Sequence, residues 1–243
     1  MMCRSDNTYT DKWKSMRAGL WANTEPEVKL IGLTVPGEMD SDGMSFAITS
    51  GSFVESWQVE RQVARAATVS TGVDIKNQGG LVRKLIDLGH HTPLEVIQYV
   101  FHVTGISKAA AAQMSRHRIG QGHVSSSRRY QTQGIRFVYP LLENIDDEAT
   151  ARQTYTIIQD SYQEAYSCYT GLRCIGVKKG DCRYLIPTAS SQERIWWVNA
   201  RALRDFLKLR LHLTAEAEVR RLANMILGVA MQITPTLFED VSK

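Results

Sequence analysis

The stretch SRHRIGQGHVSSSRRY, residues Ser115–Tyr130, is the part of the chain that the other motifs surround. It holds four Arg, two His and four Ser, together with two Gly that let the backbone bend. Its second half shows no apolar period of 2 or 3.6, so packing against a core does not explain it. Guanidinium groups, hydroxyls and flexible backbone amides together suit a phosphate-bearing ligand. A solvated basic loop is the alternative, so the flanking sequence has to decide between them.

The bulk composition bounds the class of protein. The chain has 243 residues, of which 43% are hydrophobic and 22% charged, enough for one sizeable core. A net charge of +4 is too weak to predict a nucleic-acid partner. Its four Cys show no metal-ligand spacing, no apolar run approaches the ~20 residues of a membrane span, and the polar N-terminus is not a secretory signal. We therefore expect a soluble cytoplasmic protein without a metal site.

Hydrophobic periodicity predicts strands and helices that alternate along the chain. Strands are expected over residues 27–35, 96–104, 134–138 and 193–198. Helices are expected over residues 57–67, 78–88, 106–118, 146–175, 200–213 and 214–233. With residues 1–27 as an N-terminal extension, the pattern predicts one α+β domain over residues 28–243. It would contain a central, mostly antiparallel sheet flanked by helices, including long helices in the C-terminal half.

Helical spacing also predicts which side chains are buried or paired. In the helix over 146–175 the expected buried side is Ile157, Ile158, Tyr162, Ala165, Tyr166, Tyr169 and Leu172. In the helix over 200–213, Arg210 falls back on the face of Asn199, beside an apolar stripe, where it either finds partners or extends past the helix end to solvent. Arg201 and Asp205 are four residues apart on another face, where a surface ion pair is the simplest interpretation.

Four motifs in register resemble the flavin-dependent thymidylate synthases. The signature of that family is matched by Arg116-His117-Arg118, seven residues, Ser126, one residue and Arg128. The segment Gly89–Glu95, which reads GHHTPLE, precedes a predicted strand as in the family. Further matches follow downstream, at Asp181-Cys182-Arg183 with Pro187 and from Asn199 through Arg201 to Arg210. The resemblance runs from about Ala66 to Arg210.

The resemblance implies an enzyme that methylates deoxyuridine monophosphate to thymidylate. Methylenetetrahydrofolate would supply the carbon, FAD would carry the hydride, and NADPH would reduce the flavin. It also implies a homotetramer with active sites between subunits, and no nucleic-acid or membrane partner.

The same resemblance assigns roles residue by residue. Cofactor binding falls to His90, Thr92, Glu95, Arg116, His117, Arg118, Asn199, Arg201 and Asp205. Substrate binding falls to Gln113, Arg116, Ser126, Ser127, Arg128, Arg183 and Arg210. Arg210 and Ser126 are the expected catalytic residues. Arg210 would lie beside the uracil imide and favour its ionised form, since a fixed cation lowers a neighbouring pKa.

The loop departs from the family pattern at several positions. Gln121, His123 and Val124 stand where Ser, Asn and Glu are usual, Arg129 separates Arg128 from Tyr130, and Asp205 replaces an Asn. A local insertion would make Ser127 and Arg129 the equivalents of the signature residues, although we prefer the ungapped match. The departures leave two alternatives open. One is a folate-dependent pyrimidine nucleotide hydroxymethylase of the same fold, and the other is a non-catalytic nucleotide-binding protein.

Overall fold

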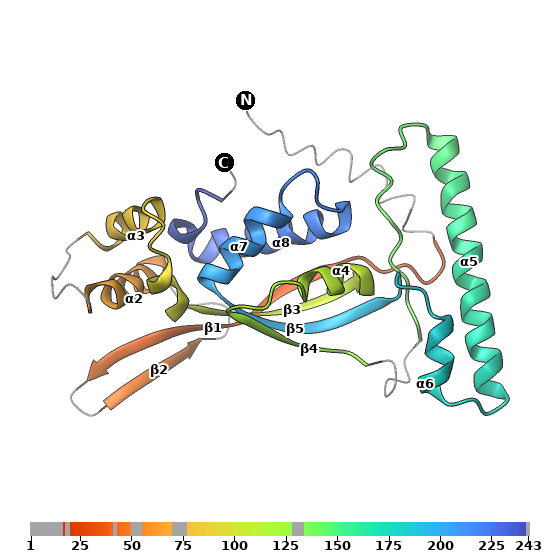
Figure 1. Ribbon diagram of the computed structural model, residues 1–243, viewed down its shortest axis with the longest axis horizontal. Coiled ribbons are helices and arrows are strands. Elements are labelled where there is room, and N and C mark those ends of the chain that lie inside the picture. Colours follow the sequence, from red (N-terminus) through yellow and green to blue (C-terminus); the bar gives the residue numbers. More distant parts are fainter. Residues whose placement is uncertain are drawn as a thin grey trace. The chain divides into compact units, whose positions relative to one another are not determined.

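The fold is built on an antiparallel sheet. A computed structural model describes residue 17 and residues 20–40, 43–49, 55–69, 77–127 and 134–241. Within these residues the five strands lie in the order β2-β1-β3-β5-β4 (Figure 1). Their bounds are β1 Glu27–Asp40, β2 Gly43–Thr49, β3 Gln98–Ser107, β4 Gln121–Ser125 and β5 Ser191–Asn199.

The helices confirm most of the predicted elements. Their bounds are α2 Ser56–Thr68, α3 Gln78–Asp87, α4 Lys108–Met114, α5 Glu148–Cys174, α6 Lys179–Cys182, α7 Ala200–Arg210 and α8 Ala217–Ile233. Short 3-10 turns are η1 Thr92–Val96, η2 Arg183–Leu185 and η3 Pro235–Leu237. The α+β class is therefore confirmed, with a long helix, α5, in the C-terminal half. No helix of the described residues is both long and apolar enough to cross a membrane.

Several predicted boundaries were wrong for identifiable reasons. β1 continues past Pro36, because the proline lies at a register shift between Pro36 and Met39 where a missing N–H is tolerated. α4 ends four residues early, since the amides of Arg116 and His117 bond three residues back, to Gln113 and Met114. Over the predicted strand 134–138 the structure has only isolated bridges, at Phe137.

The chain divides into two compact units that are interleaved along the sequence. The first unit takes residues 1–27, 104–112 and 125–193, and the second takes 28–103, 113–124 and 194–243. The single domain over residues 28–243 and the extension boundary at residue 27 stay predictions.

The core of the first unit forms where α5 meets the segment after residue 134. Phe137 stacks on Tyr162 with ring centroids 4.6 Å apart, and Trp21 packs on Phe137 at 5.7 Å. The buried side of α5 follows Ala151, Tyr155 and Tyr162. Ile158, Tyr162, Tyr166 and Tyr169 of the predicted side pack in this core, whereas Ile157 is 63% exposed, because neighbouring helical residues point about 100° apart.

Gly105 shows how closely the N-terminal segment approaches β3 in the first unit. Its φ is +69°, a left-handed conformation that favours glycine. A Cβ on this residue would lie 1.9 Å from the carbonyl oxygen of Glu25. Only a residue without a side chain can therefore stand where residue 25 passes.

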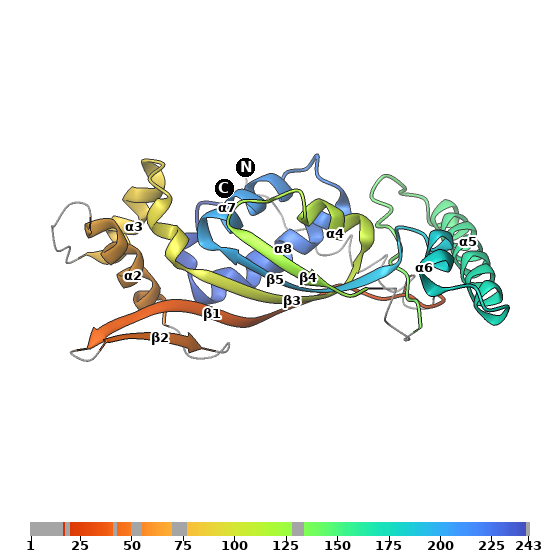
Figure 2. The same ribbon diagram turned by 60° about the horizontal axis from the view of Figure 1, so that its bottom comes forward.

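The core of the second unit is a series of aromatic rings between the sheet and the C-terminal helices. Tyr99 stacks on Phe101, and Phe101 on Trp196, with centroids 6.0 and 5.7 Å apart. Trp196 then contacts Phe206 of α7 at 5.2 Å. In both views α7 and α8 lie over one face of the strands (Figures 1 and 2). These contacts fix α7 against β5.

Candidate functional site

Arg210, at the C-terminal end of α7, joins two segments that are 93 and 97 residues away in the sequence. Its Nε donates to Nε2 of His117 at 3.3 Å. Its two terminal nitrogens donate to Oε1 of Gln113 at 2.9 Å and to the Gln113 carbonyl oxygen at 3.4 Å. The partners that the helical wheel required for Arg210 are thus two other predicted site residues.

The contacts of His117 favour its neutral form. A guanidinium can only donate, so Nε2 of His117 accepts, and in the neutral imidazole the proton is then on Nδ1. Burial lowers the pKa of His117, and the charge of Arg210 lowers it further, while Asp205 of α7 opposes the shift. Phe206 packs edge-on against the same ring at 5.1 Å. The ring is fixed on two sides by α7.

Gln121 anchors the turn that carries Arg116, His117 and Arg118. Its amide nitrogen donates to the carbonyl oxygen of Met114 at 3.3 Å and also to that of His117. Its amide oxygen accepts from the indole N–H of Trp196 on β5. The residue that departs from the family pattern is therefore a structural link between the turn and the sheet.

Asn199 caps the N-terminus of α7. Its side-chain oxygen accepts from the amide of Ala202 at 2.8 Å, which caps the helix N-terminus. Gly120, with a φ of +70°, passes so close that a Cβ there would lie 2.5 Å from Nδ2 of Asn199. The predicted cofactor-binding role of Asn199 remains a prediction beside this observed role.

The remaining cofactor candidates of the second unit lie on its surface. Arg201 donates to Oε1 of Glu95 at 2.7 Å, so its partner is in η1 and not the Asp205 expected from helical spacing. Side chains that are exposed to solvent include those of His90, Thr92, Arg116, Arg118 and Asp205. Three exposed guanidinium groups, of Arg116, Arg118 and Arg201, suit the pyrophosphate of a dinucleotide.

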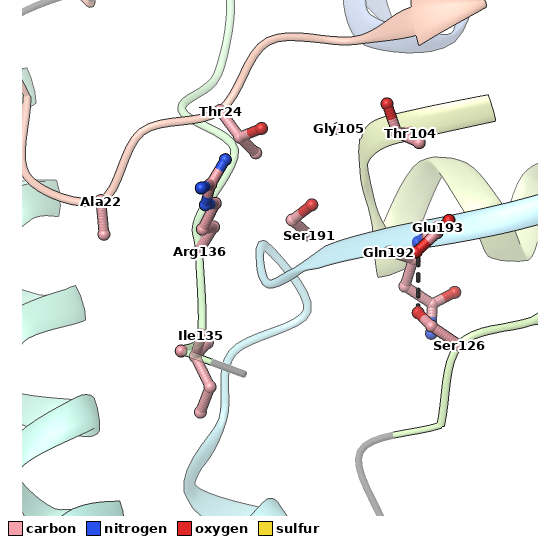
Figure 3. Close-up of a pocket in the computed structure, with 11 residues that line it drawn as sticks. Ala22, Thr24, Thr104, Gly105, Ser126, Ile135, Arg136, Ser191, Gln192 and Glu193 are labelled. Atoms are coloured by element: carbon pink, nitrogen blue, oxygen red, sulfur yellow. Dashed lines mark hydrogen bonds between the residues drawn. The ribbon is translucent and has the colours of Figure 1, made fainter. Parts of the chain in front are cut away.

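Ser126 lies in the first unit at a polar pocket of about 710 Å³ (Figure 3). Its Oγ accepts from the amide of Glu193 at 3.2 Å, which leaves its own O–H free to donate. Other hydroxyl groups in the lining come from Thr24, Thr104 and Ser191. Figure 3 shows Arg136 on the side of the pocket opposite Ser126, directed toward Thr24.

Arg136 is a candidate that sequence reasoning missed. It is exposed, and its guanidinium makes no hydrogen bond or ion pair with the described residues. A hydroxyl-lined pocket with one cation can hold an anion, although the carboxylate of Glu193 is also in the lining. Nothing in the sequence around residue 136 pointed to this role.

The other predicted substrate residues are placed less fully. Ser127 follows β4 and is half-buried, and Arg183, in η2, is exposed with its guanidinium carbon 5.9 Å from the ring centroid of Tyr184. Arg128, Arg129 and Tyr130 lie outside the described residues. In the second unit the structure joins Gln113, His117 and Arg210, whereas Ser126, Ser127 and Arg183 belong to the first unit.

These features define an α+β protein in which Gln113 and His117 orient a half-buried arginine, Arg210, at the end of α7. Comparison with known families makes the assignment specific. The family described as thymidylate synthase complementing protein matches residues 52–236. The chain belongs to this family.

Three curated relatives share the name flavin-dependent thymidylate synthase. A flavin-dependent thymidylate synthase of Thermosipho africanus is 32% identical over 194 residues, covering 74% of this chain and 84% of the relative. One of Thermosipho melanesiensis is 31% identical over 219 residues, covering 82% and 94%. One of Geobacter sulfurreducens is 30% identical over 184 residues, covering 73% and 78%. The resemblance found in the sequence motifs is thereby confirmed.

Proposed function

We propose that this chain methylates deoxyuridine monophosphate to thymidylate, with FAD as its flavin, methylenetetrahydrofolate as carbon donor and NADPH as reductant. The observation that carries the proposal is the Arg210 cluster. It brings together Gln113 and Arg210, which the family resemblance assigned to substrate binding, and His117, which it assigned to cofactor binding. The names of the curated relatives support the same reaction.

Arg210 would act on the pyrimidine ring by charge. Its hydrogen-bond partners in the described part of the chain, Gln113 and His117, are neutral, so its positive charge is not cancelled by them. Beside a uracil imide, this cation would lower the pKa of the imide and stabilise the negative charge that develops on the ring. Gln113 and His117 would hold the guanidinium plane in place while this happens.

The flavin would lie along the exposed face of the second unit. Arg116, Arg118 and Arg201 would contact its pyrophosphate, with Thr92 and Glu95 beside them. His90 and Asn199 are the further candidates for contact, and Asp205 would place a carboxylate near the cofactor. When bound, the flavin would supply the hydride that completes the methyl group. The fit rests on the number of exposed donors, since a dinucleotide carries two phosphates.

The first unit has its own candidate groups for binding a phosphate. Ser126 offers a hydroxyl at the pocket in Figure 3, and Arg136 offers a cation there. Ser127, Arg128 and Arg183 complete the proposed set. Ser126 needs no role as a nucleophile in this scheme, because its hydroxyl serves as a phosphate donor.

Assembly as a homotetramer in the cytoplasm is the corresponding proposal for the protein as a whole. Three apolar side chains in the turn after α4 and around the end of α7 are exposed, namely Ile119, Leu209 and Leu213. Association with other copies of the chain would cover such side chains. Light scattering of the purified protein measures the assembly directly, and a monomer at micromolar concentration would contradict it.

The decisive experiment is an absorption spectrum followed by a product assay. We expect a yellow protein that oxidises NADPH faster when deoxyuridine monophosphate is added, and a product whose mass corresponds to thymidylate. A colourless protein that FAD does not reconstitute would overturn the proposal. A hydroxymethylated product would overturn the methylation step and support the hydroxymethylase alternative. Affinity for nucleotide without flavin would support the non-catalytic alternative.

A further inference from the structure

Gln121, which lies between Gly120 and Gly122, makes three side-chain hydrogen bonds that join separate elements. It follows Gly120 and begins β4, and its side chain contacts the turn after α4 on one side and β5 on the other. No role had been assigned to it, since it stands where the family resemblance places a serine. We infer that Gln121 is a positioning residue that sets the geometry of the His117–Arg210 pair.

The chemical reason lies in the end of α4. The last carbonyls of a helix and of the turn that follows lack partners within the helix. The carbonyl of His117 is such a group, whereas that of Met114 already accepts from the amide of His117, and both also accept from the amide nitrogen of Gln121. A primary amide has two N–H donors and one acceptor, so it can hold two carbonyls and the indole of Trp196 together. A serine hydroxyl has one donor on a much shorter side chain.

The contacts form a closed circuit around His117. Gln121 holds its main-chain carbonyl and also accepts from Trp196. Trp196 packs on Phe206 at 5.2 Å, and Phe206 packs on the imidazole of His117 at 5.1 Å. Arg210, four residues after Phe206 on α7, closes on Nε2 of the same ring. Backbone and side chain of His117 are thus fixed by one connected set of residues, which passes through Gln121.

The relevance of this circuit to turnover rests on the function proposed above, whereas its geometry does not. A residue that misplaces a catalytic group by about 1 Å can reduce the rate by about a hundredfold. Replacement of Gln121 should therefore reduce kcat by up to about a hundredfold. KM for NADPH should change little, since the residue would not contact that substrate.

The direct test is an NMR titration of His117 in the full-length protein without ligands. Gln121→Met keeps the length of the side chain and removes all three hydrogen bonds. The His117 ring should then become more exposed and lose its fixed contact with Arg210. Its pKa should rise toward the ordinary value of 6.5, with Asp205 and Arg210 of α7, and the flanking Arg116 and Arg118, still present.

Two further variants make the outcome specific. Gln163→Met makes the same chemical change on α5, outside the circuit, and should leave the His117 titration unchanged. Trp196→Phe keeps the ring packing and removes the indole N–H, so it should shift the titration in the same direction by less. If Gln121→Met does not fold, Trp196→Phe alone tests the circuit.

The possible results separate this inference from the proposed function. A titration of His117 that is unchanged in both Gln121→Met and Trp196→Phe overturns the inference. A shifted titration in a protein whose wild type neither binds flavin nor makes thymidylate supports the positioning role and overturns the proposed function instead. Gln121→Ser, which restores the family's usual residue, should shift the titration as Gln121→Met does, because one hydroxyl cannot replace three bonds.

Discussion

Two of the three arginines of helix α7 are six residues apart and are held in opposite ways. Arg204 is fully buried and donates to both carboxylate oxygens of Asp240, at 2.7 and 2.6 Å, and to the carbonyl of Leu237. Arg210 is half-buried, and its hydrogen bonds in the described residues go to an amide, a carbonyl and an imidazole. Asp240 neutralises the charge of Arg204, whereas neutral groups only orient the guanidinium of Arg210.

The difference separates a structural cation from a chemical one. A buried guanidinium paired bidentately with a carboxylate is fixed and has little charge left to act on a ligand. A guanidinium oriented by neutral groups keeps its field and can stabilise an anion that arrives later. The comparison predicts that changes at Arg210 affect turnover, while changes around Arg204 affect folding.

The largest expected effect is on turnover, in Arg210→Lys. Lysine keeps the charge but lacks the planar fork that reaches Gln113 and His117 together. We expect kcat/KM for deoxyuridine monophosphate to fall by about 10²- to 10³-fold, with little change in the thermal unfolding temperature. The exposed Lys208→Arg exchange on the same helix is the control and should leave both quantities unchanged. A large loss of stability in Arg210→Lys would show that Arg210 is structural as well.

The next effect is on stability, in Asp240→Asn. This change leaves the buried Arg204 without its carboxylate, which costs about 3 kcal/mol of unfolding free energy. Urea denaturation of the full-length protein measures the loss. The neighbouring Glu239 pairs with Arg83 at 2.5 Å on the surface, so Glu239→Gln should cost less than about 1 kcal/mol. Equal losses in the two variants would remove the distinction between buried and exposed pairs.

The smallest effect is the response of the two sites to acid. The hydrogen bond from Arg204 lowers the pKa of Asp240, so the stability from this pair is present above the unfolded pKa of about 3.9 and is lost as pH falls through the folded value. The pKa of His117 is also lowered, so stability from its neutral form is lost as pH falls from about 6.5 toward the folded value. Protonation of Nε2 of His117 also removes the acceptor for the Nε–H of Arg210.

Mild acid should therefore affect the Arg210 cluster before it affects the Arg204 pair. Urea midpoints between pH 3 and pH 7, for the wild type and for Asp240→Asn, should show this order. The difference between the two proteins should persist at pH 5 and shrink below about pH 4. A difference that vanishes already at pH 6 would contradict the assignment of the acid window to Asp240.

Sequence reasoning predicted the α+β class and the place of Arg210 because both depend on periodicity. The helical wheel of α7 indicated that Arg210 needs partners but did not identify them, and the structure shows that they are Gln113 and His117. β4 was missed, since its five residues, QGHVS, have no apolar alternation and are half-buried or exposed throughout. A strand that is held by backbone hydrogen bonds to its neighbour needs no alternating pattern of side chains, so its own sequence does not reveal it.

Contacts over long sequence distances could not be predicted in the same way. Helical spacing offered Arg201 a partner four residues away, yet it pairs with Glu95, which is 106 residues earlier. The role of Gln121 depends on Trp196, 75 residues later, and on the carbonyls of Met114 and His117 at the end of α4 and in the turn that follows. Arg136 enters the candidate site only through the pocket that its neighbours form.

Gly105 has a consequence for how the sequence can vary. The carbonyl of Glu25 occupies the space that a Cβ at residue 105 would need. As long as the N-terminal segment keeps this path, every substitution at position 105 should be selected against. In a shortened chain that begins after residue 25, the same position would lose its steric restraint, although its left-handed backbone would still favour glycine. The tolerance of one site in the middle of the chain is thus set by residues at its beginning, and a mutational scan of both lengths would reveal it.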